Sequence, residues 1–174
     1  MKRSFWMTMF VALAWVTLTG CGQVYVNIPP AAGDMATHDP NDKTARQVQV
    51  AALRGVLAEY PSDGTVRVTL PEGTTKLHYA TMLPKVSESA IGPDDAGDAA
   101  TDLHVRAIRV RGKSGEVDVV RDTGDQKGQV ITVRLSWQPM DEWKADQLRS
   151  WSAITDDTLR TAKSAQNPAP PQTP

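Results

Sequence analysis

The chain has 174 residues, and its 19 lysines and arginines nearly balance its 20 aspartates and glutamates, for a formal net charge of −1. A nucleic-acid-binding protein would carry a strongly basic face, so this composition argues against that class. Cys21 is the single cysteine, which excludes an internal disulfide and a zinc site made of cysteines.

The first twenty residues have the features of a signal peptide. Lys2 and Arg3 precede an uncharged, mostly apolar run of 14 residues from Phe5 to Leu18. A run of this length fits the apolar part of a signal peptide and is too short for a membrane-spanning helix, which needs ~20 residues. We therefore expect residues 1–20 to be cleaved from the mature protein.

The apolar run ends in Leu18-Thr19-Gly20-Cys21, which resembles the lipobox of bacterial lipoproteins. The resemblance implies a diacylglycerol on the Cys21 sulfur, cleavage before this residue, and a further acyl chain, such as palmitate, on the new amine. Three acyl chains are enough for stable anchoring, at ~0.8 kcal/mol per buried methylene. The alternative is a soluble protein with a buried Cys21, which does not explain why the cysteine stands directly behind the apolar run.

Residue 22 bears on which membrane holds the protein. In lipoproteins an aspartate after the lipidated cysteine is the usual signal for retention in the inner membrane, and this chain has Gly22 there. The sequence therefore favours the outer membrane, with the protein facing the periplasm and attached to the membrane through the lipid on Cys21.

Both ends of the mature chain are predicted to be flexible. Residues 21–43 are expected to form the lipidated N-terminus and a tether, because prolines, Gly, Asp and Asn punctuate them. The alternation of Val24, Val26 and Ile28 leaves a short strand open as an alternative. Residues 44–155 are expected to form a single domain. Residues 156–174 are predicted to be a short helix followed by a proline-rich, disordered tail.

Residues 43–60 have the period of a helix, with Thr44 as the N-cap. Gly55 inside this helix costs up to ~1 kcal/mol relative to alanine, which indicates close packing at that point. The predicted apolar face consists of Val50, Leu53, Val56, Leu57 and Tyr60.

A strand follows over residues 65–70, because Val66, Val68 and Leu70 alternate with polar residues. Its apolar side chains are expected to share one buried face.

Residues 75–86 predict a second, shorter helix that ends near Pro84. Its apolar face is expected to contain Leu77, Ala80 and Leu83. Residues 87–102 are predicted to form an acidic loop.

Residues 103–121 predict a hairpin around a four-residue turn, Gly112 to Gly115. In the register that places Arg111 opposite Glu116, Arg109 faces Asp118. The apolar residues that then meet on the other face are Ile108, Val110, Val117 and Val119. Before them the apolar positions change from even to odd numbers, which predicts a β-bulge near Ala107.

Residues 129–138 and 142–151 predict two further strands, with Trp143 facing Trp137. A helix is the alternative for the second segment, because its apolar residues also fit one helical face. The strand is favoured. The inward side chains expected in the first segment are Ile131, Val133, Leu135 and Trp137.

These elements predict an α+β domain in which an N-terminal helix packs on a curved antiparallel sheet. The arrangement loosely resembles the cystatin and nuclear-transport-factor-2-like group of folds. The body of the chain is also similar to uncharacterised small lipoproteins of high-GC bacteria. Neither resemblance rests on a motif, and neither implies a function.

The residue pattern predicts no catalytic site, metal site or cofactor. The histidines lack the spacing of metal ligands, and the aspartates of residues 94–102 lack the spacing of a calcium loop. The three histidines are His38, His78 and His104. Arg106, Arg109 and Arg111 form a basic row, which we interpret as a solvent-exposed face paired with acids rather than a site for phosphate or an anionic polymer.

Trp137, Trp143 and Trp151 gather near the C-terminus, where they would either fill the core or form a binding surface. The expected function is a non-enzymatic binding or interaction module with an envelope protein or polymer as its partner. The alternative is a small-pocket enzyme or small-molecule binder of nuclear-transport-factor-2-like shape. The two differ in whether titratable groups converge in a deep pocket.

Overall fold

The structure, a computed structural model, describes residues 25–123, 128–139 and 142–151. The predicted signal peptide, Cys21 and the segment 156–174 lie outside the described residues. Within the described ranges, no helix is both long and apolar enough to span a membrane.

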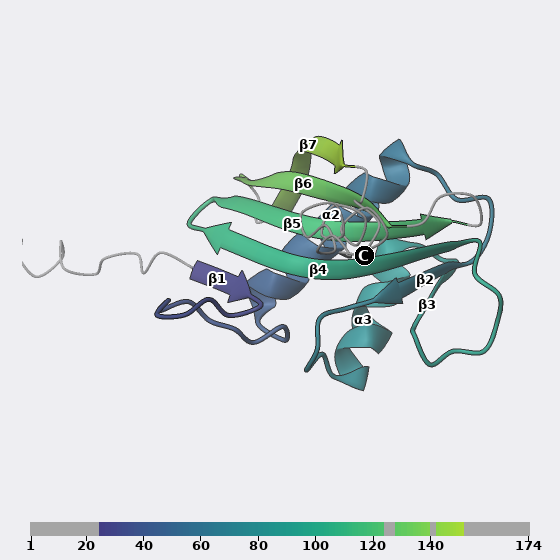
Figure 1. Ribbon diagram of the computed structural model, residues 1–174, viewed down its shortest axis with the longest axis horizontal. Helices are drawn as coiled ribbons and strands as arrows, with labels where there is room; N and C mark the ends of the chain where they lie inside the picture. Colours follow the sequence, from purple (N-terminus) through teal and green to yellow (C-terminus); the bar gives the residue numbers. More distant parts are fainter. Residues whose placement is uncertain (1–24, 124–127, 140–141, 152–174) are drawn as a thin grey trace, which may run out of the picture.

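Over these residues the fold is α+β, as predicted, with two helices and an open seven-stranded sheet that is mostly antiparallel. Figure 1 shows α2 behind the sheet. The strand order is β3-β2-β4-β5-β6-β7, and β1 pairs with β4 outside this order. The bounds are β1 Tyr25–Ile28, α2 Lys43–Glu59, β2 Val66–Thr69, α3 Lys76–Val86, β3 Ala90–Ile91, β4 Thr101–Arg111, β5 Ser114–Thr123, β6 Gln129–Gln138 and β7 Glu142–Trp151.

Four consecutive long strands form most of the sheet. β4, β5, β6 and β7 pair antiparallel with their neighbours, which confirms the strand predicted at residues 142–151. Trp143 pairs with Trp137 as predicted, with ring centroids 5.4 Å apart and ring planes at 71°. β2 and β3 run parallel to their neighbours, because α3 and the loop after β3 return the chain to the end of the sheet at which β2 began.

One edge of β4 is shared by two short strands. β2 pairs in parallel with Thr101 to His104, and β1 pairs antiparallel with Ile108 to Arg111. Between these two stretches the β4–β5 register shifts between Val105 and Ala107, which confirms the β-bulge predicted near Ala107.

Residues 25–28, predicted as part of a tether, instead form β1 of the sheet, and Thr37 bridges back to Val26. Val26 is fully buried and Ile28 is 6% exposed, so the alternating residues of β1 supply an apolar face to the core. The short strand left open as the alternative is therefore confirmed. The tether was favoured because the partner of β1 lies about eighty residues further along the chain. The folded domain therefore begins close to Cys21.

The loop between β1 and α2 is organised by Asp34. Its carboxylate accepts hydrogen bonds from Asn27 Nδ2 at 2.5 Å, Ala31 N at 3.1 Å and Ala36 N at 3.0 Å. It also lies 3.1 Å from His38 Nε2. These contacts tie the loop back to β1.

α2 differs from its prediction at the cap and in its buried face. Asp42, not Thr44, is the N-cap, and its carboxylate accepts hydrogen bonds from Thr44 N at 2.7 Å and Ala45 N at 3.3 Å. A carboxylate is favoured at this position because it also interacts with the positive end of the helix dipole. The predicted Val50, Leu57 and Tyr60 are only partly buried. The buried face consists of Ala45, Val48, Gln49, Ala52, Leu53 and Val56.

α3 ends at Val86, two residues after Pro84, in agreement with the helix predicted at residues 75–86. Pro84 lies in the last turn, where it removes one backbone donor without ending the helix. Leu77, predicted to be buried, is 72% exposed, and Ala80 is also exposed. The helix instead buries Met82 and Val86.

The predicted register of the β4–β5 hairpin is wrong by two residues. Arg111 pairs with Ser114 and Arg109 with Glu116, so the turn is the two residues Gly112 and Lys113. A shift of two residues keeps every side chain on its face. The predicted apolar residues are therefore fully buried: Ile108, Val110, Val117 and Val119.

The core lies between the sheet and α2, and it is tightest at Gly55. A Cβ placed on Gly55 would lie 2.7 Å from Ala145 Cβ in β7. This confirms the close packing predicted from a glycine inside a helix.

Candidate functional site

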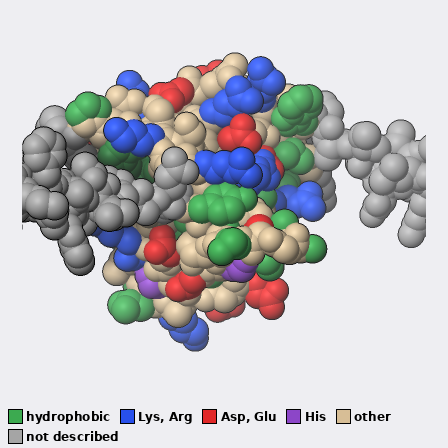
Figure 2. Space-filling model, turned by 90° about the vertical axis from the view of Figure 1, so that its left-hand side faces the viewer, with side chains coloured by type: hydrophobic (Ala, Val, Ile, Leu, Met, Phe, Trp, Pro, Cys, Tyr) green, Lys and Arg blue, Asp and Glu red, His purple; other side chains and the backbone are tan. Residues whose placement is uncertain are grey.

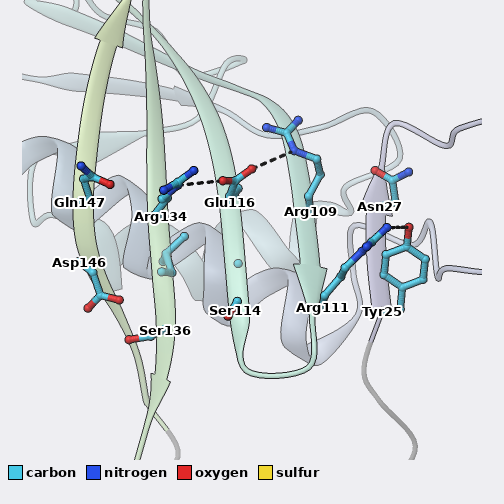
Figure 3. A pocket seen from close by; sticks show the side chains of 12 residues that line it. Tyr25, Asn27, Arg109, Arg111, Ser114, Glu116, Arg134, Ser136, Asp146 and Gln147 are labelled. Atoms are coloured by element: carbon cyan, nitrogen blue, oxygen red, sulfur yellow. Dashed lines mark hydrogen bonds and ion pairs between the residues drawn. The ribbon is translucent and has the colours of Figure 1, made fainter.

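The outer face of the sheet, on the side away from α2, carries a groove of about 750 Å³, which we call the outer-face groove. Figure 3 shows that its side chains come from β1, β4, β5, β6 and β7. Its lining includes Tyr25, Asn27, Arg109, Arg111, Ser114, Glu116, Arg134, Ser136, Asp146 and Gln147. The alternation of the strands explains this arrangement, because their apolar residues occupy the opposite, core-facing side.

Glu116 joins two arginines from neighbouring strands across this groove (Figure 3). Its carboxylate oxygens lie 3.0 Å from Arg134 Nε and 3.7 Å from Arg109 Nε. Arg109 Nη2 also lies 2.8 Å from Asp118 Oδ2, and Thr132 Oγ1 donates a hydrogen bond to the other oxygen of Asp118. Exposed ion pairs contribute only ~0.2–1 kcal/mol each. The row therefore gives the face an alternating charge pattern rather than much stability.

Arg111 ends this row and is bound differently. Its Nη2 donates a hydrogen bond to the Tyr25 hydroxyl over 3.3 Å, and its guanidinium carbon lies 5.1 Å from the Tyr25 ring centroid. The hydrogen bond with Tyr25 raises the pKa of Arg111 above its ordinary value. Because Arg111 is exposed and its partner is not a carboxylate, its charge remains available to an anion.

A second groove, of about 760 Å³, lies between α2, α3 and β7, and we call it the helix-side groove. Apolar residues, among them Val50, Ala51 and Trp143, form part of its lining. Glu142 is the acidic residue that lines it. Its cationic residues are Lys43, Arg46, Arg54, Lys85 and Lys144.

The two grooves differ in how their charges are balanced. In the outer-face groove Arg109 and Arg134 are paired with carboxylates. In the helix-side groove none of the five cations makes an ion pair with another residue of the ranges that the structure describes. The helix-side groove therefore combines an excess of positive charge with apolar surface.

The structure brings together two of the three tryptophans predicted as a binding surface. Trp143 is 9% exposed and belongs to the core, and Trp137 packs against its ring. Trp151 lies at the other end of β7, where it pairs with Val130 and is 55% exposed. The three side chains therefore do not share one surface.

The three arginines of the predicted basic row also differ in their contacts. Arg109 pairs with Asp118, as predicted, whereas Arg111 contacts Tyr25 instead of Glu116. Arg106 is exposed at the bulge. Among the described residues, no group of three or more His, Asp or Glu side chains is placed to hold a metal ion.

The sequence-based prediction missed Tyr25, Arg134 and the cations of α2. Arg134 stands at an outward-facing position of a predicted strand. The alternation of the strand therefore predicts on which face of the sheet its side chain lies, but not which side chains it contacts. The cations Arg46 and Arg54 lie one helical turn before and after Val50, so the sequence places positive charge beside an apolar residue on this side of the helix, which is a readable signal.

Figure 2 views the molecule from the end at which β1 lies in Figure 1. Lys and Arg side chains lie over the upper and middle parts of this end, with Asp and Glu side chains among them and hydrophobic side chains next to them. Comparison with protein families, with curated proteins and with solved structures finds no match for this chain.

Proposed function

We propose that the protein is a lipoprotein of the bacterial envelope, anchored through lipid on Cys21 to the outer membrane and facing the periplasm. The observation that carries this proposal is Leu18-Thr19-Gly20-Cys21 directly behind a positively charged start and a 14-residue apolar run. The absence of any other cysteine supports it, because this thiol has no disulfide partner within the chain.

The anchored domain is a non-enzymatic binding module. Its outer-face groove spreads over five strands and presents paired charges and hydroxyls, a chemistry suited to a polar partner such as an envelope protein or polymer. Arg109 and Arg134 there already have acidic neighbours, so they are arranged for complementarity rather than for reaction.

A second candidate is a small-molecule binder of nuclear-transport-factor-2-like shape. It is favoured by the helix-side groove, whose volume falls in the range of small-ligand pockets and whose cations make no ion pair with a described residue.

Metabolic labelling with a tagged palmitate tests the anchor. The wild-type chain should become labelled and sediment with membranes, and Cys21→Ser should be unlabelled, because only this residue offers the sulfur that the lipid requires. Met35→Ala is a control, since its side chain is 97% exposed and distant from residue 21 in the sequence. Equal labelling of the wild type and Cys21→Ser would refute the proposal.

Photocrosslinking in intact cells distinguishes the two binding candidates. A photoreactive residue at Gln147, which lines the outer-face groove, should capture a macromolecule if the module binds an envelope partner. The same residue at Gln47, in the helix-side groove, should instead capture a small molecule, seen as a small increase in the mass of the protein, if that groove is the binding site.

A further inference from the structure

The first strand of the sheet lies very close in sequence to the proposed anchor. Only residues 22–24 separate Cys21 from Tyr25, the first residue of β1. Four peptide units reach at most about 14 Å, so a lipidated Cys21 would hold Tyr25 within that distance of the membrane surface. The folded domain would then stand directly on the membrane instead of on a long tether.

The register of the sheet fixes which end of the domain is held there. Tyr25 pairs with Arg111, Arg111 with Ser114, Ser114 with Ser136, and Ser136 with Lys144. The turn residue Lys113 also lies at this end, because its carbonyl accepts a hydrogen bond from the Trp137 amide at 2.9 Å. We call this the β1 end, on the left in Figure 1 and facing the viewer in Figure 2.

The β1 end presents exposed positive charge. Arg111, Lys113 and Lys144 are exposed, and none of them makes an ion pair with a described residue. Asp39 and Asp42, which directly precede α2, and Glu142 are acidic residues of this end. The five cations outnumber these three acids, because Lys43 and Arg46 line the same groove as Glu142 and Lys144. Figure 1 shows that α2, which carries both cations, begins at this end.

The opposite end of the domain is acidic. The loop between β3 and β4 extends there (Figure 1). It carries Asp94, Asp95 and Asp98, all of them exposed. β4 separates the two ends with 11 residues, a length of about 33 Å. A negatively charged surface would therefore attract the β1 end and repel the other.

We propose that the β1 end lies flat against the anionic phospholipid surface of the membrane that holds the anchor. Arg111, Lys113 and Lys144 contact lipid phosphates, and the half-buried Trp137 lies beside them at the depth of the headgroups. This inference rests on the proposed lipidation of Cys21 and adds a fixed orientation to it. The acidic end then projects away from the membrane. The part of the outer-face groove lined by Tyr25, Arg111, Ser114 and Ser136 lies at the membrane, and the part lined by Arg109, Glu116 and Arg134 lies further from it.

The lipidated full chain, reconstituted in vesicles of phosphatidylglycerol and phosphatidylethanolamine, provides the test. Because lipid occupies its single cysteine, a dye can be placed on one introduced cysteine. Ser114→Cys labels the β1 end and Ala96→Cys labels the acidic loop, and both sites are exposed and leave the cations intact. A lipid with a nitroxide on its headgroup should quench the dye at 114 strongly and leave the dye at 96 nearly unquenched.

Charge variants test the electrostatic part. Removing a lysine from an anionic surface should lower the ratio of docked to undocked orientations about fivefold. Lys113→Gln with Lys144→Gln should therefore lower it by about 25-fold, and 1 M salt should do the same. Arg106→Gln with Arg149→Gln is the matched control, since these exposed arginines lie away from the β1 end and should leave the ratio unchanged.

The outcomes separate this inference from the proposed function. Equal quenching at 114 and 96 in a lipidated, vesicle-bound protein would overturn the orientation and leave the anchor intact. Stronger quenching at 96, or equal effects of the two charge pairs, would also overturn it. Failure of Cys21 to take up palmitate would refute the anchor itself, and with it the orientation.

Discussion

Asp34 shows how one carboxylate can hold a loop against a strand of a sheet. It is 11% exposed and accepts three hydrogen bonds, two from backbone amides and one from Asn27 of β1. His38 contacts the same carboxylate and also bonds Asn27 O through Nδ1 at 2.7 Å. Losing this carboxylate would leave the loop over β1 without its common acceptor.

The charge of Asp34 makes this contribution dependent on pH. The hydrogen bond from Asn27 lowers the pKa of Asp34 below its ordinary value of 3.8. A carboxyl whose pKa is lower in the folded than in the unfolded state stabilises the fold above its unfolded pKa, and this stabilisation is lost as the pH falls through the folded pKa. We expect Asp34→Asn to unfold at a lower urea concentration than the wild type at pH 7, with the difference shrinking below about pH 4.

Asp94→Asn is the matched control, because this exposed aspartate makes no hydrogen bond or ion pair with a described residue. It should unfold like the wild type at both pH values. A difference between Asp34→Asn and the wild type that is the same at pH 3 and pH 7 would contradict the ionic role.

Among the elements, the contact of α2 with β7 depends on Gly55. Replacing Gly55 with alanine gains up to ~1 kcal/mol of helix propensity. It also forces a Cβ to 2.7 Å from Ala145 Cβ, whose position is fixed by the strand backbone and cannot change by side-chain rotation. Overpacking of this kind costs ~1–3 kcal/mol, so Gly55→Ala should lower the free energy of unfolding in urea despite its better propensity.

Two further variants test whether overpacking against Ala145 is the cause of the lower stability. Ala145→Gly in the Gly55→Ala background should recover most of the loss, because it removes the opposing atom. Arg54→Ala, an exposed neighbour on the same helix, should leave stability within ~0.5 kcal/mol of the wild type. A Gly55→Ala protein as stable as the wild type would show that α2 can move away from β7 at no cost.

At the scale of the whole molecule, β1 decides where the domain begins. Val26 is fully buried, and truncating it to alanine removes two methyl groups from the core. Val26→Ala should destabilise the entire domain by about 2 kcal/mol in urea unfolding, in one transition. Met35→Ala, which is in the same segment and 97% exposed, should have no measurable effect. Equal stability of the two variants would return residues 25–42 to the role of a tether.

Local patterns were sufficient to predict the long strands. Apolar and polar residues alternate in residues 103–121, 129–138 and 142–151 because each strand has one buried face. The buried faces predicted from this alternation are correct. The hairpin register was not determined by this pattern, because the observed and predicted registers differ by two residues and bury the same side chains. The small residues Ser114 and Gly115, taken as turn residues, belong to β5.

The candidate site was less predictable, because it depends on contacts between distant parts of the chain. Tyr25 meets Arg111 only because β1 crosses back to β4, and no local signal encodes that pairing. The buried face of α2 was misplaced because Ala45, Gln49 and Ala52 are not large apolar residues. Their burial follows from the close approach of the helix to the sheet, which the sequence indicates only through Gly55.

The pairing of β1 with β4 also determines how the domain bears mechanical load. Tension between the anchor and a bound partner would enter the fold at Tyr25 and act along β1. The ladder hydrogen bonds run perpendicular to that direction, so the four residue pairs from Tyr25–Arg111 to Ile28–Ile108 are sheared together instead of being unzipped one at a time. The connection between the proposed lipid anchor and the sheet is thus a strand pair loaded in shear, the geometry in which a short strand resists the largest force.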